Sequence, residues 1–308
     1  MAAVEAKGVA REHAPGRGVR DVSLTVADGE CYALLGRNGS GKTTLTRMLL
    51  GLEPVQQGEL RVLDTAVDKG VRTHLGRLGV ALDRSVHWET LSGWQNAHFA
   101  ARSYGVPHTE VAARLEEQFE RAGLAAEAHE PVGTYSYGMR RKLSLVAALV
   151  HDPDLLVLDE PTAGVDPQFL LQLTETVRDR SKRGKTTWVA SNDPDWVAAA
   201  ATRVAFLEAG ALVAEGTVDE LVGEVASRQE VRIELASAAA LGKPDIKGVS
   251  SFDCRRATVE ALLDGDPALV PKLMEWTVGQ GGQVKTLEVR RGTLRDAFLQ
   301  ATGRSLES

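Results

Sequence analysis

A glycine-rich stretch near the N-terminus carries the residue types with the most specific chemistry. It reads Gly36, Arg37, Asn38, Gly39, Ser40, Gly41, Lys42, Thr43, Thr44. Glycines let consecutive backbone N–H groups curl around an anion, and a helix that starts there adds partial positive charge. Lys42 is expected to reach the β- and γ-phosphates, and the Thr43 hydroxyl to hold Mg²⁺. The stretch predicts a binding site for a nucleoside triphosphate.

Two acidic residues follow an apolar run at 155–158. A strand that ends beside the phosphate-binding loop would place Asp159 where it can hold Mg²⁺ through water. Glu160, the next residue, would orient and deprotonate the attacking water as a general base. Together the two motifs predict Mg²⁺-dependent hydrolysis of the nucleotide.

The elements that must position these residues follow an α/β pattern. Apolar runs predict strands at 19–26, 31–35, 58–62, 77–82, 155–158, 186–191, 203–208 and 211–215. Helical patterns lie at 43–50, 140–150 and 167–183, so a mostly parallel, buried sheet with helices on its faces is expected. A second, small α+β unit is predicted from a strand at 230–235, a strand at 251–262, a helix at 267–279, a strand at 284–289 and a helix at 293–301. We therefore expect domains at 1–227 and 228–308, with a helical subdomain at about 85–150.

Composition narrows the possible classes of protein. The chain has 308 residues and a net charge of −6, which argues against a duplex-DNA binder and predicts no nucleic-acid partner. No run of about 18 apolar residues predicts a membrane span, and the first residues lack the apolar core of a signal peptide. The two cysteines, Cys31 and Cys254, lie far apart, so a reducing, cytosolic location is expected.

Four motifs in order resemble those of ATP-binding cassette (ABC) ATPases. They are the glycine-rich stretch, residues 135–139 (YSYGM), residues 155–161 (LLVLDEP) and residues 163–166 (AGVD). The resemblance covers about residues 5–225 and implies a RecA-like P-loop core, an antiparallel β subdomain and a helical subdomain. It also implies that two cassettes sandwich two ATP molecules, and it adds Ser136, Gly138 and Asp166 to the nucleotide-binding residues. The C-terminal segment, with its extra small domain, resembles exporter-type cassettes that serve separate membrane permeases of the ABC-2 class.

Several accessory positions depart from the pattern of that family. Asn192 stands where a switch histidine is usual, and its amide can donate a hydrogen bond to the γ-phosphate without carrying charge. Asp83 replaces a glutamine and could approach Mg²⁺ directly or through water. Residues 135–139 correspond to the signature motif of the family, and Tyr137 stands there where a glycine is usual. His13 is the nearest candidate to stack on adenine, with an ordinary surface histidine as the open alternative. We expect a working but slow ATPase.

Aromatic residues in the helical region suggest how the closing motion that ATP drives is transmitted to a membrane permease. In the family, this region receives helices of the permease, and Trp88, Trp94 and Phe99 are aromatic anchors that suit a groove. The alternative is that they pack inside the helical subdomain.

A second cassette completes the sites, in a homodimer or in a heterodimer. The chain would thus lie on the cytoplasmic face of the membrane, bound to its permease. A degenerate cassette that regulates an active partner remains the alternative function, and the exported substrate is not encoded in this chain.

Overall fold

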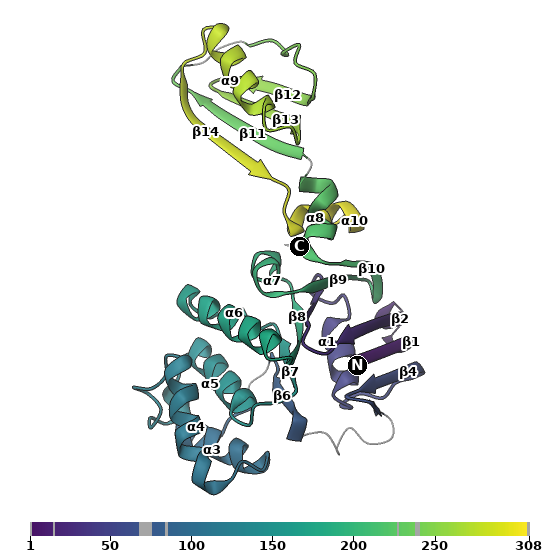
Figure 1. Cartoon of the computed structure of the whole chain (residues 1–308), viewed down its shortest axis with the longest axis vertical. Coiled ribbons are helices and arrows are strands. Elements are labelled where there is room, and N and C mark those ends of the chain that lie inside the picture. Colours follow the sequence, from purple (N-terminus) through teal and green to yellow (C-terminus); the bar gives the residue numbers. More distant parts are fainter. Residues whose placement is uncertain are drawn as a thin grey trace. The chain divides into compact units, whose positions relative to one another are not determined.

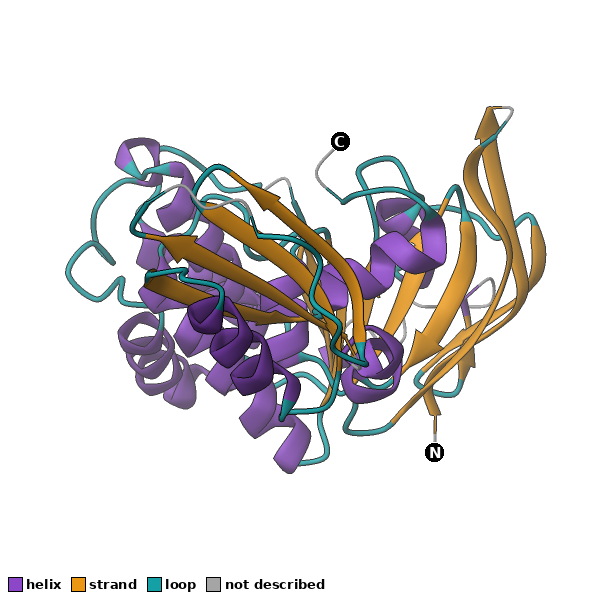
Figure 2. Cartoon of the chain, turned by 90° about the horizontal axis from the view of Figure 1, so that it is seen from above, coloured by secondary structure: helices purple, strands orange, loops and turns teal. Residues whose placement is uncertain are grey.

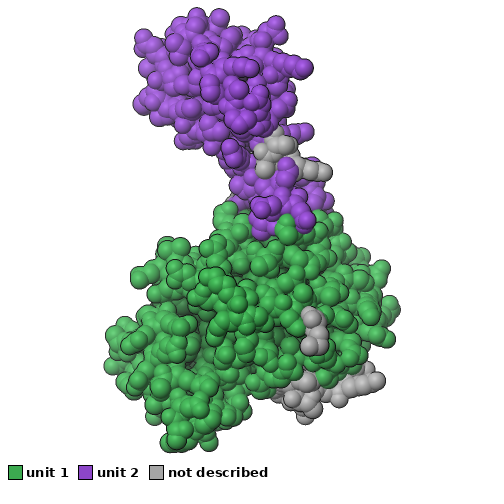
Figure 3. Space-filling model, in the orientation of Figure 1, with its two compact units in different colours: residues 1–217, 306–308 green, residues 218–305 purple. Residues whose placement is uncertain are grey.

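The computed structural model describes residues 2–14, 16–67, 76–83, 86–226, 228–237 and 241–306. The chain forms two compact units, coloured separately in Figure 3, which comprise residues 1–217 with 306–308 and residues 218–305. The domain boundary predicted from the sequence lay between residues 227 and 228, whereas the structure divides the chain after Thr217. Helix α8 (Val218–Ala226) packs against α10 (Leu294–Thr302), and these contacts group it with the second unit. Ser85, the predicted start of the helical region, lies outside the described residues.

A six-stranded sheet forms the centre of the first unit (Figure 1), in the order β10-β9-β3-β8-β7-β6. In that order the strands are β10 (Ala211–Gly216), β9 (Arg203–Glu208), β3 (Cys31–Leu35), β8 (Thr186–Ser191), β7 (Leu155–Asp159) and β6 (Leu78–Ala81). All neighbours are parallel except β10, which pairs antiparallel with β9. Every residue of β3, β7 and β8 is buried, as expected for strands covered on both faces. The predicted α/β fold is confirmed, and Figure 2 shows its mixture of helices and strands.

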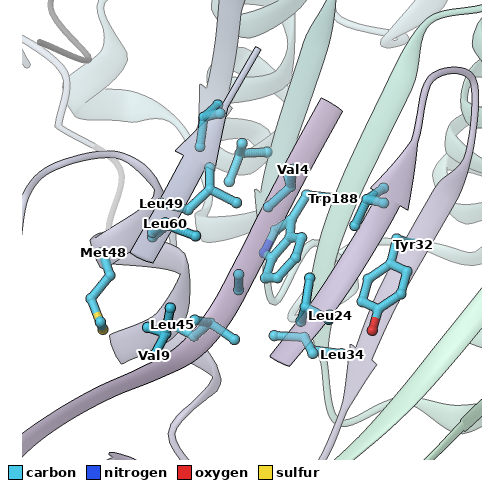
Figure 4. Packing of buried hydrophobic residues seen from close by; sticks show 14 of the residues in the cluster. Val4, Val9, Leu24, Tyr32, Leu34, Leu45, Met48, Leu49, Leu60 and Trp188 are labelled. Carbon is cyan, nitrogen blue, oxygen red and sulfur yellow. The ribbon is translucent and has the colours of Figure 1, made fainter. Parts of the chain in front are cut away.

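An antiparallel sheet lies against the central one, in the order β2-β1-β4-β5. Its strands are β1 (Ala2–Ala14), β2 (Arg17–Ala27), β4 (Gln57–Val62) and β5 (Thr65–Ala66). Helix α1 (Lys42–Leu49) buries Leu45, Met48 and Leu49 in the core that both sheets share. Figure 4 shows these side chains grouped with Val4 and Trp188. The helix that follows the phosphate-binding loop is therefore anchored by the main hydrophobic core.

Helices α3, α4 and α5 form the helical region, and α6 and α7 accompany the central sheet (Figure 1). Their bounds are α3 (Gly93–Ser103), α4 (His108–Arg121), α5 (Tyr137–Leu149), α6 (Pro167–Lys182) and α7 (Pro194–Ala200). Ser92 and Gln95 form a capping box at the start of α3. Helix α5 packs on β6, which connects the helical region to the edge of the central sheet. Within the described residues, no helix has both the length and the apolar character needed to cross a bilayer.

The second unit has an antiparallel sheet in the order β12-β13-β11-β14. It consists of β12 (Val249–Arg255), β13 (Thr258–Asp264), β11 (Arg228–Leu235) and β14 (Val284–Arg291), with α9 (Leu269–Gly279) packed on one face. The prediction of one strand over 251–262 is wrong, because the chain turns at Arg256, which has a φ of +55°. Helix α9 also starts later than predicted, because the Asp266 carboxylate first accepts the Ala268 N–H in a turn.

Candidate functional site

The glycine-rich stretch forms a loop between β3 and α1. Gly36 has no room for a side chain, because a Cβ there would lie 2.4 Å from the Leu207 carbonyl oxygen. Gly41 has a φ of +109°, and a Cβ there would lie 2.6 Å from the Gly18 carbonyl oxygen. The Ser40 hydroxyl is buried without a hydrogen-bond partner in the described structure. Close packing of Gly36 and Gly41 against neighbouring backbone thus fixes the conformation of the loop, as an anion-binding site requires.

A cavity of about 550 Å³ opens in front of this loop and is called the P-loop cavity below. Its walls are His13, Arg17, Gly18, Asn38, Gly39, Gly41, Lys42, Thr43, Thr44, Asp83 and Glu160. Most of the nucleotide-binding residues predicted from the first motif are therefore together. Arg17 and Gly18, at the start of β2, were missed because no phosphate-binding pattern includes them. Gly36, Arg37 and Ser40 belong to the loop but are not part of this wall.

Lys42 is buried, and its ammonium group is held by polar atoms of the loop. The Nζ donates to the Gly36 carbonyl at 2.7 Å and to the Arg37 carbonyl at 3.1 Å. It also lies 3.2 Å from Oε1 of Glu160. The positive charge is therefore positioned in the cavity wall beside the Glu160 carboxylate, where phosphate oxygens can replace that partner.

Glu160 is the first residue after β7 and has a φ of +50°, a rare conformation for a side chain of this size. Its N–H donates to the Ala190 carbonyl of β8 at 2.8 Å. Its Oε2 accepts the backbone N–H of Asn192 at 3.1 Å. Two neighbouring strand ends thus hold the carboxylate against Lys42. Asn192 contributes its backbone to this arrangement, and its side chain is not part of the cavity wall.

Asp159 is a buried carboxylate at the end of β7, only 2% exposed. Its Oδ1 lies 3.5 Å from the Thr43 hydroxyl. Burial raises the pKa of Asp159 to about 6, and the negative charge of Glu160 adds to this effect. A poorly compensated carboxylate beside a hydroxyl is a donor set that suits a hard cation. Thr43 and Asp159 are therefore residues whose chemistry fits Mg²⁺.

Asp83 follows β6 and also faces the P-loop cavity. Its carboxylate lies 2.5 Å from Nη2 of Arg141, a buried residue of α5. Arg141 was not predicted from the sequence, because its contact with Asp83 spans 58 positions of the chain.

His13 lies on β1 rather than in the loop that the sequence suggested. Its Nε2 is 3.1 Å from Oε2 of Glu53 and 3.4 Å from the Thr44 hydroxyl. Arg11, the other residue considered, pairs with the same Glu53 carboxylate at 2.8 Å and does not reach the cavity wall. Of the two, only His13 is placed beside the P-loop cavity.

The signature residues form a separate surface at the N-terminus of α5. Ser136 caps this helix, because its hydroxyl accepts the Met139 N–H at 3.2 Å. A Cβ at Gly138 would lie 2.7 Å from the Gly164 carbonyl oxygen. Asp166 caps α6 and forms an ion pair with Lys142 at 2.7 Å. Ser136, Gly138 and Asp166 are absent from the wall of the P-loop cavity, so one chain does not bring them together with Lys42.

Of the three aromatic residues considered in the helical region, two are exposed and one packs against interior side chains. Trp88 and Phe99 contact edge to face at 4.7 Å between ring centroids, and they are 52% and 55% exposed. Trp94 stacks on the buried Phe119 with centroids 5.9 Å apart. The exposed pair is available for a partner, whereas Trp94 packs within the helical region.

Comparison with known proteins gave consistent matches. The family described as "ABC transporter" matches residues 19–163. A fluoroquinolones export ATP-binding protein of Mycobacterium tuberculosis is 32% identical, over 94% of this chain and 88% of that protein. A daunorubicin resistance ATP-binding protein of Streptomyces coeruleorubidus is 33% identical, over 98% of this chain and 96% of that protein. A solved structure of an ATP-binding subunit of an ABC transporter superposes with a TM-score of 0.67 at 24% identity, covering 72% of this chain and 92% of that one.

Proposed function

Because the chain belongs to the ABC transporter family of ATP-binding proteins, we propose that it is the ATP-hydrolysing subunit of a membrane exporter. The observation that carries this proposal is the cavity in which Lys42 and Glu160 face each other at 3.2 Å, with Asp83 and Thr43 in the same wall. The cavity contains groups for binding phosphate, holding Mg²⁺ and accepting a proton.

The chemistry follows from the contacts of Lys42 and Glu160. Phosphate oxygens that bind Lys42 displace its Glu160 partner, which frees the carboxylate to accept a proton from water. The backbone N–H of Asn192 continues to hold Glu160 in place. Mg²⁺, held by Thr43 and Asp159, would offset the negative charge of the phosphates. Asn192 supplies no imidazole, so the reaction is slow.

A second cassette completes each site. Ser136 and Gly138 lie outside the P-loop cavity of their own chain, while the N-terminus of the 13-residue helix α5 carries partial positive charge suited to an anion. These residues then serve the γ-phosphate bound by a partner subunit. Two copies of this chain are the simplest assembly, and a heterodimer gives the same geometry.

Export is proposed from the relatives, whose names refer to fluoroquinolone export and daunorubicin resistance. A permease supplies the membrane-crossing part, and the cassette binds it on the cytoplasmic face. The exposed Trp88 and Phe99 side chains are proposed to line the docking groove, because exposed aromatic anchors are typical of interfaces.

Hydrolysis is tested by comparing the ATPase rate of the purified chain with that of Glu160→Gln. The variant should lose at least about 100-fold in kcat, while equilibrium binding of a fluorescent ATP analogue persists. Equal rates in both proteins would refute the catalytic role of Glu160. If the parent chain itself bound ATP without turnover, the alternative, a degenerate cassette, would replace the proposal. The unusual residues Asn192 and Asp83 are the observation that favours this alternative.

Docking is tested with Trp88→Ala in cells that produce the permease. This variant should lose co-purification with the permease in mild detergent and retain ATP binding. Leu171→Ala is a matched control, because Leu171 is an exposed apolar residue, 69% accessible, on α6. Equal co-purification of the Trp88 variant and the control would exclude Trp88 from the docking groove.

A further inference from the structure

Two residues that depart from the family pattern, Asp83 and Tyr137, are joined by a third residue, Arg141. Nη2 of Arg141 contacts Oδ1 of Asp83 at 2.5 Å. The guanidinium carbon of Arg141 also lies 5.4 Å from the centre of the Tyr137 ring. In the described part of the chain, Asp83 has no other hydrogen-bond partner, so its second oxygen is left for the P-loop cavity that it lines.

Arg141 is buried and holds the ends of two strands as well as Asp83. Its Nη1 donates to the Leu82 carbonyl at 2.9 Å and lies 3.5 Å from the Asp159 carbonyl oxygen. A guanidinium cannot lose its proton in a protein, so this charge is permanent. Its side chain is only 5% exposed, whereas Asp83 is 52% exposed. The cation is therefore fixed, and the carboxylate is positioned by it.

Tyr137 covers the guanidinium from the side of the signature motif. A Cβ on Gly164 would lie 2.6 Å from the Tyr137 ring, so the ring packs directly on the backbone of that glycine. The ring thus packs on the Gly164 backbone and lies over the Arg141 guanidinium, while Tyr137 remains 55% exposed. Because Arg141 is buried, its interaction with Asp83 is less screened by water than one between two surface charges.

Asp83 requires a positively charged partner because other carboxylates already lie near the cavity. A carboxylate at position 83 adds a negative charge beside Asp159 and Glu160, where the phosphates of ATP must bind. The pKa of Asp159 is raised mainly by burial and by Glu160, and Asp83 contributes in the same direction. An unpaired Asp83 would repel ATP, whereas a neutral amide at this position would not.

We propose that Arg141 is a positioning residue that neutralises Asp83, so that the ion pair replaces a neutral amide at the edge of the nucleotide site. The pair offers a carboxylate oxygen to the cavity without adding net charge. This inference rests on the proposed ATP-binding function. It connects the two departures from the family pattern, since the Arg141 cation that pairs with Asp83 also lies against the Tyr137 ring.

The test measures the dissociation constant of a fluorescent ATP analogue in EDTA, where no metal offsets the charge of Asp83. Arg141→Gln should weaken binding about tenfold, from Coulomb's law at an effective dielectric constant of about 20 and a separation of roughly 10 Å. Arg141→Lys keeps the charge and should stay within about threefold of the parent. Arg140→Gln is the matched control, because Arg140 pairs with Glu89 away from the cavity.

The double variant Asp83→Gln/Arg141→Gln decides between positioning and simple structural support. It should restore binding to within about twofold of the parent, because the unpaired charge is gone. If Arg141→Gln bound ATP as tightly as the parent, or if the double variant stayed as weak as Arg141→Gln, the proposal would be wrong. Failure of the parent chain to bind the analogue would instead overturn the proposed ATP-binding function and this inference with it.

Discussion

Replacing the buried carboxylate of the proposed magnesium site should stabilise the nucleotide-free protein. Asp159 is 2% exposed, and its hydrogen bond from the Thr43 hydroxyl is long, at 3.5 Å. Ionised Asp159 is therefore poorly compensated when no cation is present. Asp159→Asn keeps the shape and the hydrogen-bond acceptor but removes the charge, so the folded state no longer contains a buried, unpaired anion.

The magnitude follows from the pKa of Asp159, raised from 3.8 to about 6 by burial and by the charge of Glu160. At about 1.4 kcal/mol per pKa unit, ionised Asp159 costs the folded state about 3 kcal/mol. Below about pH 3 the group is mostly protonated in both folded and unfolded chains, so it contributes almost no difference. As the pH rises from 4 to 6, the unfolded chain loses the proton first and the free energy of unfolding falls. The gain from Asp159→Asn should thus be about 1 kcal/mol at pH 4.5 and about 3 kcal/mol at pH 8.

The assay is thermal unfolding in EDTA between pH 4.5 and 8, followed by calorimetry. At pH 8 the transition of the first unit should rise by roughly 6–12 °C in Asp159→Asn. Asp154→Asn, at the other end of the same strand, is a control with the opposite sign. Burial raises the pKa of Asp154, but hydrogen bonds from Lys185 and Arg77 outweigh burial and hold this pKa below its usual value. Asp154→Asn should therefore destabilise the protein at neutral pH. A loss of stability in Asp159→Asn at pH 8, or a gain independent of pH, would refute the reasoning.

Three further predictions concern other residues. Asn192→His should raise the ATPase kcat about tenfold by supplying an imidazole near the γ-phosphate, and an unchanged steady-state rate would argue against this role. Gly164→Ala should lower the free energy of unfolding by about 1–3 kcal/mol, because a Cβ would meet the Tyr137 ring at 2.6 Å and the φ is +70°. Denaturation of the Gly164→Ala/Tyr137→Gly double variant should show partial recovery. Trp188→Phe removes the Nε1 donor 3.0 Å from the buried Thr46 hydroxyl and should cost about 1–3 kcal/mol in urea unfolding; an unchanged midpoint would contradict that estimate.

The α/β class and the nucleotide-binding loop were predictable because they depend on local patterns. An anion cradle is made from consecutive backbone N–H groups, so residues 36–44 reveal it in one stretch. Apolar strands buried on both faces are equally local signals, and β3, β7 and β8 were predicted closely. The ends of α10 depend on equally local features, since the capping box at Thr293 and the left-handed Gly303 act within one turn of the helix.

Irregular strands were harder to predict. The register of β1 shifts at several points along its pairing with β2, so its apolar residues do not alternate regularly, and no strand was predicted there. The turn between β12 and β13 passes through Arg256 in a left-handed conformation, without a glycine, proline or asparagine to mark it. Bulges and turns of this kind depend on pairing with neighbouring strands, which the local sequence does not describe.

Sequence alone was sufficient to identify the glycine-rich loop and the acidic pair, and to predict the reaction that they are proposed to support. The tertiary structure determined which charged side chains contact each other. Lys42 and Glu160 are separated by 118 positions yet lie 3.2 Å apart, because parallel strands bring their carboxyl ends to one edge of the sheet. Asp83 was identified as a departure from a pattern, but only the packing of α5 against β6 showed that Arg141 is its partner. The electrostatic balance of the site depends on such distant pairs, and the Coulomb energy of a pair is set by distance and burial in the folded chain rather than by spacing in the sequence.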